Sequence, residues 1–133
     1  MKYTLVIITV FIFAVLFLNC KAQSQAQQII NYNSLIIGTW ISEDDPDYKI
    51  EFTSQGIQKE YVNNELQEEI YQYSIIPSCG SNSNNGFDVF LKRQTNIIDY
   101  TCDIINNIHT DSNGIITLSI TTESGQLDRY IKQ

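Results

Sequence analysis

Hydrophobic and polar residues alternate along most of the chain after residue 38. Neighbouring side chains of a β-strand point to opposite faces, so a period of two is typical of a strand with one buried face. Eight such runs cover residues 38–43, 48–54, 57–62, 66–76, 87–93, 97–108, 115–121 and 126–132. No helical period interrupts them, which argues against a parallel sheet of strand–helix–strand units. The pattern therefore predicts an all-β domain.

The segments between the runs carry residues that favour turns. Pro46 and Pro77 follow the first and fourth runs, and proline cannot donate to a strand ladder. Asn113-Gly114 is expected to supply the two positive φ values of a tight hairpin. The longest connection, residues 78–86, is polar and rich in Gly and Asn. Tight turns between successive strands predict an antiparallel up-and-down meander, and closing eight strands into a barrel removes both unpaired edges.

The N-terminus has a different pattern. Lys2 precedes an apolar run from Leu5 to Leu18, which is typical of a secretory signal peptide. The run is shorter than the roughly 20 residues that a membrane-spanning helix needs. We therefore expect an exported protein that is periplasmic, attached to the outer membrane as a lipoprotein, or secreted.

Two processing sites fit this signal. Cys20-Lys21-Ala22 has small residues where a general signal peptidase reads them, which makes residues 1–22 the signal peptide. Alternatively, the segment ending in Asn19-Cys20 resembles a bacterial lipoprotein box, although Gly, Ala or Ser is usual at the position of Asn19. The signal peptide then covers residues 1–19, and a lipid on Cys20 is the only membrane attachment that we expect.

The processed chain is predicted to have two parts. Residues 23–34 are a Gln-, Ala- and Ser-rich tether that ends in a short helical turn. Residues 35–133 form the barrel. Cys79 and Cys102 are an even pair in an exported domain, which favours a disulfide, with two free buried thiols as the alternative.

Charge and composition exclude several classes of function. The chain has 15 acidic and 8 basic residues, a net charge of -7. An acidic surface repels the phosphate backbone, so we expect no nucleic-acid partner. It is 43% apolar and 11% aromatic, which is too much for a disordered chain. His109 is the single histidine, and no Cys-x-x-Cys motif is present, so zinc has no ligand set. No pattern of nucleophile, base or paired carboxylates stands out, and we expect neither catalysis nor a cofactor.

Three residues carry a resemblance to a known family. Gly38-x-Trp40 opens the first predicted strand, and Arg129 lies on the last one. With eight strands between them, these residues resemble the lipocalin-like or calycin group of small bacterial barrels. The resemblance implies that Trp40 closes the barrel floor and that Arg129 stacks across it from inside; alternatively, Arg129 reaches solvent at the strand end. The Thr-Asp-Tyr signature and C-terminal helix of lipocalins in the strict sense are absent.

Aromatic residues supply the predicted ligand site. Six of them are assigned to inward-facing positions: Phe52, Tyr61, Tyr71, Tyr73, Phe87 and Tyr100. One interpretation is a site in the barrel mouth for a small hydrophobic ligand, beside the flexible loop 78–86. The alternative is a filled interior, which makes the barrel a solid scaffold that contacts another exported protein as an inhibitor or envelope component. An internal cavity of roughly 300 Å³ or more favours the first interpretation.

Overall fold

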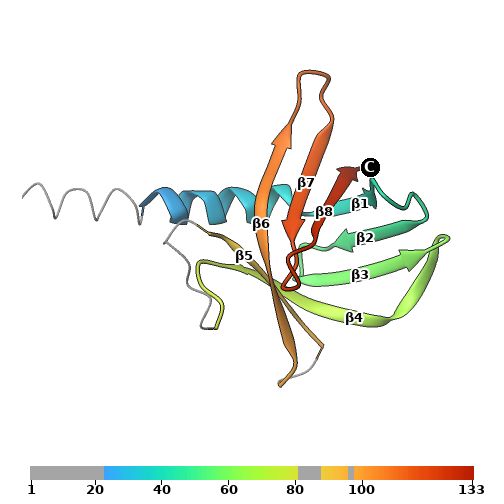
Figure 1. The fold of residues 1–133 in the computed structure, drawn as a ribbon, viewed down its shortest axis with the longest axis horizontal. Helices are drawn as coiled ribbons and strands as arrows, with labels where there is room; N and C mark the ends of the chain where they lie inside the picture. Colours follow the sequence, from blue (N-terminus) through green and yellow to red (C-terminus); the bar gives the residue numbers. More distant parts are fainter. Residues whose placement is uncertain (1–22, 81–87, 96–97) are drawn as a thin grey trace, which may run out of the picture.

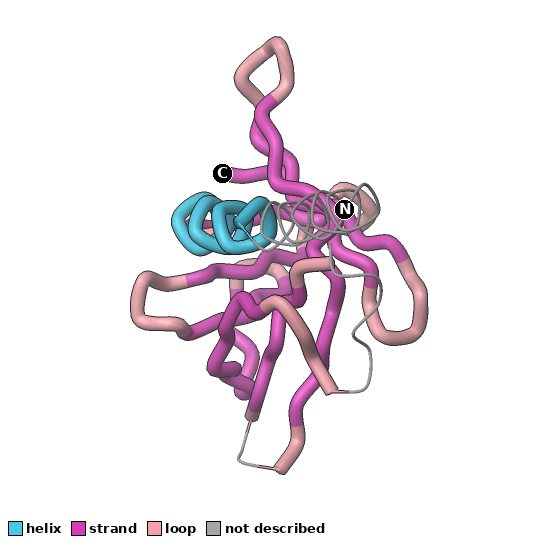
Figure 2. Tube along the Cα trace, turned by 90° about the vertical axis from the view of Figure 1, so that its left-hand side faces the viewer, coloured by secondary structure: helices cyan, strands magenta, loops and turns pink. Residues whose placement is uncertain are grey.

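The computed structural model describes residues 23–80, 88–95 and 98–133. Eight antiparallel strands pair in sequence order and close into a barrel through pairing of the first strand with the last (Figure 1). The strands are β1 (Gly38–Ser42), β2 (Tyr48–Phe52), β3 (Ile57–Val62), β4 (Glu65–Ile76), β5 (Phe90–Gln94), β6 (Tyr100–Thr110), β7 (Ile116–Thr121) and β8 (Leu127–Lys132). The predicted up-and-down barrel is therefore confirmed. The hairpin of β6 and β7 extends beyond the rest of the barrel in both Figure 1 and Figure 2.

The hairpin turns differ in detail from the prediction. Asn63 and Asn64, between β3 and β4, have φ values of 53° and 66° and are the non-glycine residues with positive φ in the described chain. At the β6–β7 turn only Gly114 has a positive φ, 82°, while the side chain of Asp111 accepts the backbone N–H groups of Asn113 and Ile115. Asparagine tolerates the left-handed region, so the Asn-Asn pair makes the two-residue turn.

The barrel interior is filled by apolar side chains along most of its length. Trp40, Phe52 and Leu118 are each at most 1% exposed. They belong to one buried cluster that also contains Ile50, Ile75, Val89, Leu91, Ile105, Ile108, Ile120 and Tyr130. Alternation places most of these residues on one face, and the irregularity between Ile105 and Asn107 on β6 brings Ile108 to the same face as Ile105.

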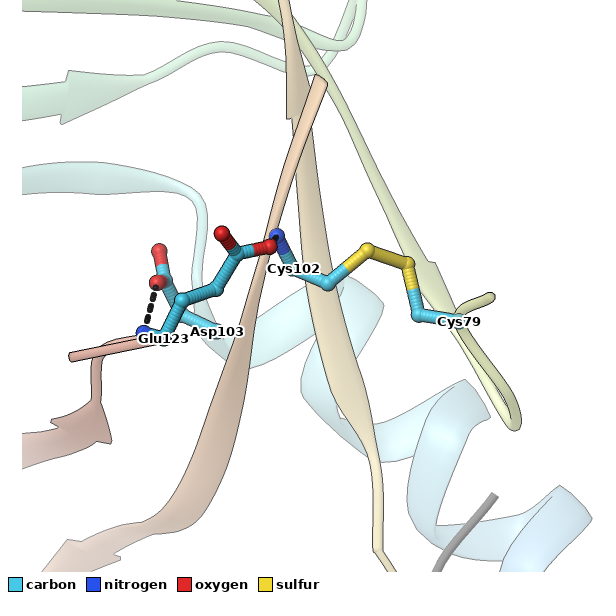
Figure 3. The surroundings of a disulfide bond; sticks show 4 residues. All are labelled: Cys79, Cys102, Asp103 and Glu123. Carbon is cyan, nitrogen blue, oxygen red and sulfur yellow. Dashed lines mark hydrogen bonds between the residues drawn. A yellow bond between two sulfur atoms is a disulfide. The ribbon is translucent and has the colours of Figure 1, made fainter. Parts of the chain in front are cut away.

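A second, smaller cluster lies on the outer faces of β4, β5 and β6. It consists of Cys79, Phe90 and Cys102, with Ile76 and Ile104 packed against it. Cys79 and Cys102 lie within disulfide distance, with their Cα atoms 6.1 Å apart (Figure 3). The bridge ties the segment after β4 to the start of β6.

The segment before β1 is more ordered than the predicted tether. Residues 23–35 are helical, because three apolar residues at helical spacing, Ile29, Tyr32 and Ile36, can pack on the barrel together. The Gln25 side chain donates hydrogen bonds to the backbone oxygens of Pro77 and Asp88, at 3.2 and 2.9 Å. Figure 2 shows the helix against one end of the barrel. The helix thus covers the barrel floor.

Trp40 and Lys132 meet at this floor. The Trp40 indole N–H donates to the Ile36 carbonyl at 2.7 Å, and the Lys132 ammonium donates to the Leu35 carbonyl, also at 2.7 Å. The ammonium lies 5.1 Å from the centre of the Trp40 ring. The last carbonyls of a helix have no partner within it, so these two side chains cap the helix C-terminus.

Gly38 makes room for the lysine. Its φ is 132°, and a Cβ at this position would lie 2.9 Å from Cε of Lys132. Glycine therefore serves two purposes here: it adopts a backbone conformation that side chains disfavour, and it leaves the path that the Lys132 stem follows to the helix.

Arg129 does not take the position that the resemblance implies. It is exposed on the outer face of β8, together with Leu127 and Ile131, whereas Tyr130 on the opposite face is buried. The pairing of Trp40 with Lys132 fixes this register. Each face of β8 carries both apolar and charged residues, so alternation alone could not tell inside from outside.

Matched substitutions on β8 test this assignment. We expect Lys132→Met to lower the free energy of unfolding by about 1 kcal/mol, because it keeps the stem but leaves the Leu35 carbonyl without its donor. Arg129→Met should change it by less than about 0.5 kcal/mol, since the side chain is exposed. Urea unfolding followed by Trp40 fluorescence measures both variants. A larger loss for Arg129→Met than for Lys132→Met would contradict the register.

The cysteine pair is expected to stabilise the barrel by restricting the unfolded chain. The two residues are 23 apart in sequence, which corresponds to about 3 kcal/mol in the loop-entropy estimate. Replacing both with serine should lower the free energy of unfolding by that order. Reduction of the unaltered protein should give a similar loss; the absence of any effect of reductant would show that the bond does not form.

Candidate functional site at the barrel mouth

The two ends of the barrel differ in what covers them. The helix closes the floor, whereas the opposite end is bordered by the turns at residues 43–47, 63–64 and 122–126. We call this second end the mouth. Charged side chains of β3, β5 and β6 face inward at this end.

A cluster of charged residues lies inside the mouth. Arg93 on β5 forms an ion pair with Asp103 on β6, and its other terminal nitrogen is 3.7 Å from Oε1 of Glu60 on β3. Asp103 is 2% exposed, and Gln58, at 1%, donates to the same Glu60 oxygen at 3.1 Å. Strand pairing explains why Arg93 and Asp103 meet: Asp103 is opposite the inward-facing Leu91, and Arg93 follows Leu91 by two residues on the same face.

Burial and charge act in opposite directions on Arg93. Desolvation lowers the pKa of its guanidinium, but the carboxylates of Asp103 and Glu60 outweigh this effect and raise the pKa overall.

The other Asp103 oxygen accepts the backbone N–H of Glu123 at 3.2 Å (Figure 3). Glu123 in turn accepts the backbone N–H of Cys102 at 2.6 Å. The β7–β8 turn and β6 therefore hold Asp103 in place against Arg93.

The disulfide lies directly behind this site. Cys102 and Asp103 are neighbours on β6, so their side chains point to opposite faces, one toward Cys79 and the other into the mouth (Figure 3). The covalent link outside the barrel thus anchors the strand that presents the buried carboxylate inside it.

Two hollows open at the mouth and share Tyr48. One has a volume of about 350 Å³. It is lined by Ser42, Asp44, Asp45, Tyr48, Arg93, Gln126, Asp128 and Tyr130. The other has a volume of about 450 Å³. It is lined by Tyr48, Glu60, Val62, Gln67, Glu68 and Glu69. Carboxylates outnumber cations in both linings.

Tyr48 and Tyr130 form an aromatic wall between the charged groups. Their ring centres are 6.4 Å apart. Burial raises the pKa of Tyr130 to about 12, and the charge of Asp128 adds to this. Burial and the nearby Glu60 also raise the pKa of Tyr48. Both phenols therefore stay protonated at neutral pH and offer a ring face and a hydroxyl donor.

The aromatic residues assigned to a ligand site from sequence are not brought together. Phe52 and Tyr73 pack edge to face in the core, with ring centres 5.0 Å apart. Tyr71 lies nearer the mouth, with the Arg93 guanidinium 5.9 Å from its ring centre. Tyr61 donates to Glu51 from the outer face. Tyr100 is 46% exposed.

The remaining predicted ligand residue, Phe87, lies outside the described residues, as do Cys20 and the predicted signal peptide. Sequence reasoning missed Gln58, Glu60, Arg93 and Asp103. Arg93 had one available signal, since it follows Val89 and Leu91 at spacings of four and two on the same face of a strand. Nothing in the pattern paired it with Asp103 or Glu60, which lie on other strands.

Comparison of the chain with protein-family models, curated proteins and solved structures found no match. Within the described residues, no helix has the length and apolar character required to cross a membrane. The same residues contain no group of three or more His, Cys, Asp or Glu side chains placed to hold a metal ion. The fold itself is a closed, eight-stranded antiparallel barrel, which is consistent with a calycin-like fold.

A double-mutant cycle tests the ion pair in the mouth. Arg93→Met or Asp103→Asn alone should lower the free energy of unfolding by about 3 kcal/mol, because each leaves a buried charge without its partner. The double variant should lose at least about 1 kcal/mol less than the sum of the two. Lys92→Met, one residue away on the outer face, is the control. Strict additivity would show that the pair is not formed in solution.

Proposed function

We propose that this protein is an exported, lipocalin-like barrel whose mouth binds a small polar molecule. The observation that carries the proposal is the contrast between the two ends: a capped, apolar floor and an open mouth that holds an inward-facing ion cluster and two tyrosines. A barrel that served only as a core would gain nothing from charges at this depth, since their desolvation costs free energy.

The lining supports a polar ligand better than the hydrophobic one expected from sequence. Asp44, Asp45 and Asp128 border the 350 Å³ hollow, and the single arginine in it is already paired. An anionic ligand would meet repulsion from these carboxylates. A large apolar ligand would have to displace packed core residues to enter further. A small hydrophobic ligand stays an untested prediction.

Export remains part of the proposal and rests on the N-terminal sequence pattern. Either processing site leaves the helix over residues 23–35 as the element between the cleaved end and the floor. A lipid on Cys20 would be attached ahead of this helix in the chain. The alternative function, a solid scaffold that contacts another exported protein, draws support from the packed core.

Fragment screening by nuclear magnetic resonance tests the proposed binding. A library of small polar, apolar, cationic and anionic compounds is added to the ¹⁵N-labelled domain. We expect polar compounds to shift backbone signals around Tyr48, Arg93 and Tyr130. Tyr48→Ala should weaken these shifts at least about fivefold by removing contact surface, whereas Tyr61→Ala, on the outer face, should not.

Three results would contradict the proposal. One is the absence of any saturable shift at the mouth, which would favour the scaffold. Another is binding confined to the outer face of the barrel. The third is a selective response to apolar compounds, which would restore the hydrophobic ligand. An intact spectrum for each variant shows that it is folded.

A further inference from the structure

Two aromatic rings line the hollow of about 350 Å³ at the mouth, those of Tyr48 and Tyr130. The ring centres are 6.4 Å apart, and the ring planes are inclined to each other at 46°. The face of an aromatic ring carries partial negative charge, so it attracts an organic cation within about 6 Å of its centre. The hollow therefore has an apolar wall that favours a positively charged ligand over a neutral one of the same shape.

The linings of the two mouth hollows have an excess of negative charge. They contain six carboxylates, which are those of Asp44, Asp45 and Asp128 in one hollow and of Glu60, Glu68 and Glu69 in the other. Among the described lining residues the single cation is Arg93, which is already paired with Asp103 and Glu60. One guanidinium between two carboxylates does not offset the remaining charges. A cleft lined by charge of one sign concentrates ions of the other sign.

Asp128 connects the aromatic wall with the negative charge. It lies two residues before Tyr130 on β8, so the two side chains are on the same, inward face of the strand. Burial, and after it the charge of Asp128, raises the pKa of Tyr130, which is consistent with their closeness. One Asp128 oxygen accepts a hydrogen bond from the Gln126 side chain at 2.9 Å. A carboxylate has about four lone-pair sites, so Asp128 keeps acceptor capacity for a ligand.

We propose, resting on the function proposed above, that the mouth binds a small organic cation with a primary ammonium group. The ammonium group donates up to three hydrogen bonds, for which Asp44, Asp45 and Asp128 are acceptors. The carbon skeleton lies against the rings of Tyr48 and Tyr130. A neutral ligand would leave the repulsion among the carboxylates in place, and an anion would add to it. A volume of about 350 Å³ falls in the range of roughly 300–1,000 Å³ typical of ligand pockets.

Probes of matched shape and different charge test the proposal on the intact domain. Phenethylamine and pentylamine are the cations, phenethyl alcohol and pentanol their neutral counterparts, and hydrocinnamate and hexanoate the anions. The ¹⁵N signals of Tyr48, Asp128 and Tyr130 are followed at low and at high sodium chloride. We expect each amine to shift these signals in a saturable manner and to bind at least about fivefold more tightly than its alcohol. Amine affinity should fall as salt rises, because salt screens the carboxylates.

Matched aspartate variants separate a local contact from an effect of net charge. Asp128→Asn keeps the shape of the side chain and should weaken amine binding at least about fivefold, with less than about a twofold effect on the alcohols. Asp88→Asn makes the same change in net charge near the floor, where the Asp88 carbonyl accepts from Gln25 of the helix. It should leave amine affinity unchanged within about twofold. The probe series and its salt dependence in the unaltered protein provide the test if Asp128→Asn does not fold.

The outcomes distinguish the two proposals. Alcohols or anions that bind at the mouth as tightly as the amines would overturn the cation class but keep the mouth as a binding site. Amine binding that is indifferent to both salt and Asp128→Asn would do the same. If calcium chloride shifts these signals and no amine does, a metal ion replaces the organic cation. If no small molecule or ion of any class binds at the mouth, both proposals fail.

Discussion

The structure depends on how the carbonyl groups at the end of one helix are satisfied. The helix over residues 23–35 meets the barrel with its C-terminus, where its last carbonyls lack intrahelical partners. Trp40 from β1 and Lys132 from β8 supply the donors. Because these residues are paired across the seam between the first and last strands, one interaction caps the helix, seals the floor and brings the sheet edges together. A closed barrel needs such a seam, since an open sheet of this size would leave two unpaired edges.

The two ends of the barrel differ in the side chains that they contain. Apolar side chains fill the barrel from the floor upward, and the ion cluster of Arg93, Asp103 and Glu60 lies where that packing stops. Charges at this depth require partners, and the register of three strands supplies them. The disulfide contributes from outside, because Cys102 fixes the strand position next to Asp103. The mouth is thus a polar end of the barrel, supported by the same sheet that forms the core.

Much of the fold followed from the sequence, because local pattern determines strand existence and turn position. Alternation gave eight strands in an up-and-down order, and the cysteine count gave the pair Cys79 and Cys102. The faces of β3, β6 and β8 could not be assigned in this way; on β6, Tyr100 is exposed and Asp103 is buried. On β3, the apolar Ile57 and Tyr61 face outward while Gln58 faces inward. Burying a polar residue there is favourable only once Glu60 and its partners are in place, and those partners are distant in sequence.

The site was harder to predict than the fold for a related reason. Arg93, Asp103 and Glu60 come from three strands, and their meeting depends on register, including the irregularity between Lys59 and Tyr61. A shift of one residue would turn every one of them to the other face. The length of the helix was underestimated because it has few apolar residues. Its stability comes mainly from packing on the barrel floor, which exists only after the barrel closes.

Hydrogen exchange at the indole of Trp40 tests the capped floor most directly. The chain has one tryptophan, so its indole N–H gives a single, unambiguous signal. If this proton is bonded to the Ile36 carbonyl within a sealed floor, it should exchange only when the whole domain unfolds, as slowly as the best-protected strand amides. Rapid exchange of the indole proton in a barrel whose strand amides remain protected would contradict the account.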